Sequence, residues 1–366
     1  MYLHILFFIL SFFSFLEIFT SFGRDKSKIK LLFILIMCIL FLFAAIRWER
    51  GTDWQTYYLF FVEPERFGHN SFEYGFTLLN KLVRTINGNF TLLLLIQSYL
   101  YYTLMTKVIL KVSIFPLFSL LVLFIVGSYA GLFFVRQTVA IAITTYSFLY
   151  IKERKLLKFI LCVLGATMLH VSSILFILSY YIYKLEISTR KLLICLFIAF
   201  MLGYFLSIFM ERYTLLGGVL MAKFNGYIEE GTNIDIVGMS ASSLYLRGVL
   251  SRFFSFLLIF SFIFSYRKQD AVCRGLFNIY LLGIVVYILA GAFNITLSRL
   301  ANCFDVFQIF LFCYAFRLSQ NLKTRLIFFV LLVSFLCVRL VSKNPYENLF
   351  VPYKSIFNKE LPVEVG

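Results

Sequence analysis

The chain has 366 residues, of which 61% are hydrophobic, 20% aromatic and only 14% charged. So few polar residues cannot cover the surface of a water-soluble globule of this length. The net charge of +16 would suit a nucleic-acid partner, but the basic residues stand in short clusters between apolar runs, so we expect a membrane protein and no nucleic-acid partner.

Apolar runs of about 20 residues, the length that crosses a bilayer as a helix, recur along the whole sequence. We therefore predict an all-α fold, a polytopic membrane helical bundle of about 10–12 transmembrane helices. It would form a single integral membrane domain over residues 1–366. The predicted membrane helices cover residues 2–22, 30–46, 90–110, 114–127, 132–151, 192–210, 244–265, 275–293, 300–317 and 326–342.

The loops between these helices differ in charge, and this difference predicts the orientation of the chain. The basic linkers are placed in the cytoplasm, where Lys and Arg are enriched. Residues 47–89 are rich in acids and aromatics and form a predicted outer loop, with an amphipathic helix at the membrane interface over residues 74–88. Residues 211–243 carry more acids than bases and form a second outer loop.

Residues 156–183 lie between two basic linkers that both belong in the cytoplasm. A single crossing would put one linker outside, so we predict a hairpin of two short helices, 156–168 and 171–183. His170 lies at its tip, near the outer side. These two helices are short for full membrane spans. The sequence is therefore compatible with two short spans or with a re-entrant pair that is buried against other helices.

Unusual polar side chains gather at the outer ends of the predicted helices. Arg136 and Gln137 lie in the first turns of the helix over 132–151, and Arg299 begins the helix over 300–317. An arginine near a helix end can extend its charge to the headgroups, which is the simplest alternative for each of them, and His170 can be a neutral histidine bonded between helices. The other members of this layer are Arg47, Asp53, Glu73, Arg247 and Arg252.

Several arginines at the membrane boundary suit a lipid-linked pyrophosphate, because guanidinium groups bind phosphate through two hydrogen bonds and keep their charge. The outer loop also offers flat aromatic faces on which sugar rings can stack. These are the side chains of Trp48, Trp54, Tyr57 and Tyr58.

Short motifs, taken in their order along the chain, resemble the EpsG family. "RWERGTDWQTYY" is similar to the R…G.D…Y signature after the second helix of that family, and "SFEYGF" to the E.G element that follows. "LFFVRQTVAIAI" and "KFILCVLGATMLHVSSIL" resemble its RQ helix and its histidine segment. "SRLANCFD" and "VPYKS" resemble two later elements, while residues 195–243 are the least similar part. The family comprises Wzy-type polymerases of bacterial O-antigen, capsule and exopolysaccharide.

The resemblance implies a glycosyltransferase that moves a growing glycan from undecaprenyl pyrophosphate to the non-reducing end of a lipid-linked repeat unit, with inversion as the expected outcome. It would lie in the bacterial inner membrane with its site facing the periplasm. We expect no cofactor and no metal, because the donor carries its own leaving group. Arg136 and Arg299 would bind the pyrophosphate, assisted by Arg247 or Arg252, and His170, Asp53 or Glu73 would act as base. The acceptor and its sugars would be bound by Arg47, Tyr57, Glu73 and Gln137.

Three other functions are also compatible with the sequence. A ligase that transfers the finished glycan to lipid A core would use the same donor and similar arginines. A flippase or transporter would place its charges near the bilayer midplane, and a membrane acyltransferase would carry a histidine near the cytoplasmic side. The expected partners are undecaprenyl-pyrophosphate-linked glycans and membrane lipid, with a chain-length regulator as a further candidate.

Overall fold

The computed structural model describes residues 2–68, 71–127, 129–133, 135–214, 241–264, 266, 270–319, 321–342 and 349–358. Within these ranges the chain is helical, and the only β pairing is an isolated bridge between Arg47 and Ser355. The predicted all-α membrane fold is confirmed. Of the second outer loop predicted over residues 211–243, residues 215–240 lie outside the described ranges, and the described residues at its two ends are helical.

Seven helices of the described chain are long and apolar enough to cross a bilayer. The segment predicted as a helix over 300–317 is an eighth candidate, but it is bent by 48° between Ile295–Asp305 and Gln308–Leu318. The seven are α1 (Tyr2–Phe19), α2 (Lys26–Ile46), α5 (Phe90–Val112), α10 (Thr189–Thr214), α12 (Ala241–Ile263), α13 (Ala271–Phe293) and α16 (Leu322–Val341).

Four further segments at predicted positions are shorter. They are α6 (Pro116–Val126), α7 (Arg136–Lys152), α8 (Leu156–Leu169) and the pair of η4 (Val171–Leu178) with α9 (Ser179–Ile182). The predicted number of about 10–12 spans is reached only if these segments, each below the usual length of about 20 residues, are counted with the eight. The two short helices predicted around His170 are present, and the chain is extended at His170 between them.

One helix boundary differs from the prediction in a way that matters for the site. The helix predicted over 132–151 begins only at Arg136. The preceding residues Tyr129, Ala130 and Gly131 have φ angles of 59°, 52° and 79°, which a right-handed helix cannot accommodate. Arg136 therefore stands at the start of α7 and not one or two turns inside a membrane helix.

Asp and Asn residues in the linkers begin many of the helices. Asp25 accepts from the amides of Ser27 and Lys28 at the start of α2, both at 3.1 Å. Asn89, Asp270 and Asn321 cap α5, α13 and α16 in the same manner. These caps satisfy amides that have no partner within the first turn of a helix.

Glu17 lies within α1, where the sequence gives no reason for a carboxylate. The structure supplies one, because Glu17 is 4% exposed and accepts from the amides of Leu117 and Phe118, at 3.3 and 2.8 Å. These amides open α6, whose first residue Pro116 has no amide hydrogen. Glu17 thus caps a helix from a neighbouring element, and α1 packs on α6.

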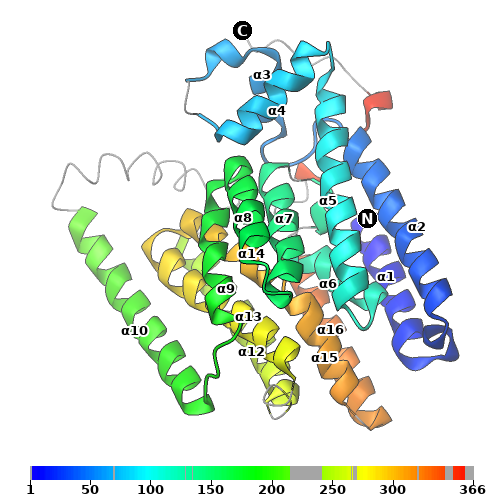
Figure 1. Ribbon diagram of the computed structural model, residues 1–366, viewed down its shortest axis with the longest axis vertical. Helices are drawn as coiled ribbons and strands as arrows, with labels where there is room; N and C mark the ends of the chain where they lie inside the picture. Colours follow the sequence, from blue (N-terminus) through cyan, green and yellow to red (C-terminus); the bar gives the residue numbers. More distant parts are fainter. Residues whose placement is uncertain are drawn as a thin grey trace. The chain divides into compact units, whose positions relative to one another are not determined.

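The chain divides into two compact units. Unit 1 comprises residues 1–174 and 319–366, in which α2 packs on α5, α5 on α7 and α7 on α8. Two short helices, α3 (Trp54–Val62) and α4 (Tyr74–Thr85), lie at one end of α5 in this unit (Figure 1). Unit 2 comprises residues 175–318, in which α13 packs against α10, α12 and η7 (Ile295–Ala301). The single domain over residues 1–366 stays a prediction.

The 47–89 region is more ordered than an outer loop. The amphipathic helix predicted over 74–88 is α4, and α3 is a helix that the sequence analysis missed. Trp54, Tyr57, Phe60 and Phe61 are spaced i, i+3, i+6 and i+7, so they share one face of this helix, and all four are buried. They pack in an aromatic cluster with Phe76 and Phe90, which explains why so short a segment is helical.

The predicted orientation can be tested with single cysteines in a background without the seven native ones. We expect Gly68→Cys to react with an impermeant thiol reagent from outside, while Ser27→Cys and Lys184→Cys react only after the membrane is opened. All three positions are exposed, and a side chain at Gly68 would meet nothing closer than 3.7 Å. Labelling of Ser27→Cys from outside with protection of Gly68→Cys would show the reverse orientation. Gly231, in the second predicted outer loop, lies outside the described residues.

Candidate active site

Arg136 is the centre of a polar cluster in unit 1. Its Nη1 forms an ion pair with Oε2 of Glu73, which immediately precedes α4. Its Nε donates to the hydroxyl of Tyr57 on α3 at 3.2 Å. The guanidinium also lies over the ring of Phe72, 4.6 Å from the ring centre, which favours a cation. Three elements that are distant in sequence therefore meet at the first residue of α7.

Glu73 links Arg136 to the segment that carries His170. Its Oε1 accepts from the amide of Val171 at 3.1 Å, while Oε2 faces Arg136. The approach of α4 to α8 that permits this contact depends on Gly75, where a Cβ atom would lie 2.7 Å from the carbonyl oxygen of Met168. The glutamate and the glycine of "SFEYGF" thus have separate physical roles, one in charge and one in close packing.

Tyr57 connects the arginine to a second carboxylate. Its hydroxyl donates to Oδ2 of Asp53 at 3.4 Å while accepting from Arg136. Burial, reinforced by the negative charge of Asp53, raises the pKa of Tyr57 to about 12, so the hydroxyl keeps its proton at neutral pH. Asp53 is itself exposed and remains accessible to a ligand.

His170 ends α8 and is half-buried. Its Nδ1 lies 2.7 Å from the hydroxyl of Ser172. This hydrogen bond orients the ring, and the next residue, Val171, is held by Glu73. We refer to Asp53, Tyr57, Glu73, Arg136 and His170 as the Arg136 cluster. It combines a cation, two carboxylates and an imidazole, the group types needed to bind a phosphate and to remove a proton.

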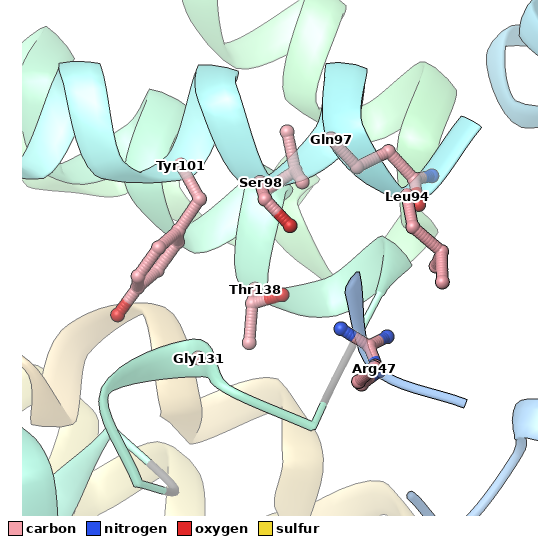
Figure 2. A pocket seen from close by; sticks show the side chains of 8 residues that line it. Arg47, Leu94, Gln97, Ser98, Tyr101, Gly131 and Thr138 are labelled. Carbon is pink, nitrogen blue, oxygen red and sulfur yellow. The ribbon is translucent and has the colours of Figure 1, made fainter. Parts of the chain in front are cut away.

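Arg47 does not join this cluster. Its side chain is 1% exposed, and its Nη1 donates to the carbonyl oxygens of Ala44 and Leu132 at 3.1 and 3.0 Å. It lines a small cavity with residues of α5 and α7, including Gln97, Ser98 and Thr138 (Figure 2). The cavity has a volume of about 10 Å³, too little for a sugar ring. The predicted role of Arg47 in acceptor binding stays a prediction that this geometry does not support.

The aromatic side chains expected to stack on sugars pack mostly on one another. Trp54 stacks on Tyr58 with ring centres 5.0 Å apart, and Trp48 meets Trp54 edge-on at 4.8 Å. Both tryptophans are at most 5% exposed. They stabilise the outer region around α3, and Tyr58 keeps partial exposure.

In unit 2, Arg252 is held by a carboxylate that the sequence analysis did not single out. Its Nε donates to Oδ1 of Asp305 at 3.1 Å, and Nη2 pairs with Oδ2. The guanidinium lies 3.4 Å from the ring centre of Tyr287. The side chains of Arg252 and Asp305 are 15% and 10% exposed. Arg252 is therefore already neutralised, and a phosphate would have to compete with Asp305 for it.

The remaining candidates occupy different positions. Arg247 on α12 and Arg299 on η7 are exposed side chains of unit 2. Gln137 follows Arg136 in the first turn of α7 and is half-buried. Their predicted roles in binding pyrophosphate or acceptor stay predictions. Across the described ranges, no three His, Cys, Asp or Glu side chains come together as a metal ion would require.

The Arg252–Asp305 pair gives a test of stability. Asp305→Asn should lower the free energy of unfolding by roughly 3–5 kcal/mol, because it leaves a buried guanidinium without its counter-charge. Replacing both residues by leucine should recover most of this loss. The matched control is Glu186→Gln, since Glu186 pairs with Arg274 but is 77% exposed and should matter by less than about 1 kcal/mol. Equal melting temperatures for Asp305→Asn and Glu186→Gln in detergent would contradict the expected role of the pair.

Comparison with known proteins places most of the chain in one family. The family model described as "EpsG family" matches residues 30–355. This range includes every member of the Arg136 cluster and the Arg252–Asp305 pair. Neither the curated proteins nor the solved structures contain a match to the chain.

Proposed function

The chain belongs to the EpsG family, whose members are Wzy-like polysaccharide polymerases, and from this premise we propose that it polymerises a lipid-linked glycan with the Arg136 cluster as its active site. The donor is a growing glycan on undecaprenyl pyrophosphate, and the acceptor is a single repeat unit on a second carrier. The enzyme lies in the bacterial inner membrane with the cluster facing the periplasm.

The observation that carries the proposal is the placement of Arg136 at the first residue of α7. Val135, which precedes the helix, supplies no capping side chain, so the amides of the first turn add positive potential beside the guanidinium. Such a helix start suits a phosphate group. Arg136 keeps 17% of its side-chain surface exposed, and its Nη2 has no hydrogen bond within the described residues.

In the proposed reaction, the acceptor hydroxyl loses its proton to a base as its oxygen attacks the anomeric carbon of the donor. The bond from that carbon to the pyrophosphate oxygen breaks, and undecaprenyl pyrophosphate leaves with the bonding electrons. Arg136 stabilises the charge that develops on the departing pyrophosphate. Attack from the opposite face, without a covalent intermediate, inverts the anomeric centre.

His170 is the base that the geometry favours. Glu73 is engaged by both Arg136 and the amide of Val171, so it acts as a positioning residue that keeps the arginine and the histidine segment together. Asp53 is exposed and bonded to Tyr57, and it orients acceptor hydroxyls. The ordinary pKa of an imidazole is near neutrality, so an imidazole can accept a proton at neutral pH without a large pKa shift.

The surface glycan of a deletion strain tests this function. A polymerase deletion should leave surface lipid capped with one repeat unit, and the plasmid-borne gene should restore the ladder of longer chains on a gel. A ligase deletion would remove the single-unit band as well. Unchanged long chains in the deletion strain would contradict the proposal.

A further inference from the structure

The cavity beside Arg47 contains hydrogen-bond donors that no described residue satisfies. Nη1 of Arg47 has two carbonyl partners, but its Nε and Nη2 are buried without a partner among the described residues. The side-chain oxygen of Gln97, which lines the same cavity and is 4% exposed, also lacks a partner there. Buried polar groups are nearly always hydrogen-bonded, so these donors and this acceptor require a water molecule or an ion in the cavity.

The charge of Arg47 is unbalanced as well. No carboxylate of the described residues forms an ion pair with it, and Glu49, two positions away, pairs with Lys354 instead. The titratable groups that act on its charge are the phenols of Tyr57, Tyr102 and Tyr353, which are neutral at neutral pH. A buried cation without a counter-charge is strongly destabilising.

The space available limits what the ligand can be. The cavity has a volume of about 10 Å³, room for one water-sized particle, so it excludes a phosphate or a carboxylate-bearing metabolite, and a halide enters with a small outward shift of the lining side chains. The hydroxyls of Ser98 and Thr138 line the cavity, and in Figure 2 the guanidinium nitrogens of Arg47 point toward α5, which carries Gln97 and Ser98. A half-turn of the Gln97 amide would present its NH₂ group as a further donor with almost no change of shape.

We propose that this cavity binds one halide-sized monovalent anion, of which chloride is the commonest. Nε and Nη2 of Arg47 hold the ion, and the Gln97 amide and the Ser98 hydroxyl complete its shell. A water molecule would satisfy the donors but would leave the charge unbalanced. Since Arg47 also donates to the carbonyl of Leu132, four residues before Arg136, the ion stabilises the segment that leads into α7.

The test measures the melting temperature of the purified protein in detergent, with sodium chloride or bromide exchanged for sodium gluconate at constant ionic strength. Gluconate is too large for the cavity. We expect a saturable rise of about 2–4 °C with either halide. Gln97→Glu, which provides a fixed negative charge beside Arg47, should fold and lose the halide dependence. The exposed Arg66→Gln should keep it.

Each result decides the question. Equal melting temperatures of the parent protein in halide and gluconate would show that the cavity holds water only, and the proposal would be wrong. The same halide effect in Gln97→Glu as in the parent would place the ion elsewhere, with the same consequence. Loss of the effect in Gln97→Glu with its retention in Arg66→Gln supports the site. The measurement reads stability, so it is independent of glycan polymerisation.

Discussion

Arg136→Ala should abolish long glycan chains while the protein remains inserted and expressed. Loss of a group that stabilises charge on the leaving pyrophosphate is expected to lower the rate by about 10²–10³. Arg136→Lys should rescue only weakly, because an ammonium cannot reproduce the contacts of the guanidinium to both Tyr57 and Glu73. The measurement is chain growth from lipid-linked repeat units by purified protein, compared at equal amounts of folded enzyme.

The control must separate lost chemistry from lost folding, because Arg136→Ala leaves Glu73 without its partner. The double variant Arg136→Ala with Glu73→Ala removes the unpaired charge and should melt close to the parent protein while remaining inactive. Arg66→Ala, which removes an exposed arginine of the same unit, should retain full activity. Full activity of Arg136→Ala would leave Arg136 with a structural role only.

His170→Ala should bind the donor almost normally yet turn over slowly, with a loss of about 10²–10⁴ in rate, as expected for removal of a general base. His170→Gln offers a closer control, since its amide can still bond to Ser172 but cannot take up a proton. The measurement is the dependence of chain growth on substrate concentration, which separates the maximal rate from the apparent affinity.

Asp53→Asn should fail differently. Its amide keeps a hydrogen bond to Tyr57 but loses the charge, so the main effect should be on acceptor affinity. A fully active His170→Ala together with an Asp53→Asn variant that is inactive at saturating substrate would reverse the two roles. His170 would then be a packing residue at the end of α8.

The sequence was sufficient to locate the membrane helices, because hydropathy and length determine which segments can lie in a bilayer, but it did not predict α3. The predicted boundary that differed most in its consequences was the start of α7, which was predicted at residue 132 and lies at Arg136. The run from Leu132 to Ala140 is apolar except for the three consecutive residues Arg136, Gln137 and Thr138, so hydropathy extends the helix through it. The left-handed residues at 129–131 end that continuity, and backbone angles of this kind at Tyr129 and Ala130 have no signal in composition.

The polar contacts likewise include some that could be predicted from the sequence and some that could not. Arg136 and Glu73 could each be selected as unusual, but their pairing depends on the packing of α4 against α8 at Gly75, which is a tertiary property. Asp305 had a usable signal, a carboxylate within a largely apolar stretch that needs a positive partner. The burial of Arg47 had none, since an arginine at a helix end is equally compatible with the interface and with a cavity.

The most direct test of polymerase activity through the Arg136 cluster is reconstitution with purified components. The parent protein in detergent or liposomes, given only synthetic undecaprenyl-pyrophosphate-linked repeat units, should produce a ladder of longer chains and release undecaprenyl pyrophosphate, one for each linkage formed. The double variant, which carries both Arg136→Ala and Glu73→Ala, should be folded like the parent protein but should produce no longer chains and release no undecaprenyl pyrophosphate. A parent protein that leaves the single units unchanged, or a double variant that extends them at the parent rate, would contradict this account.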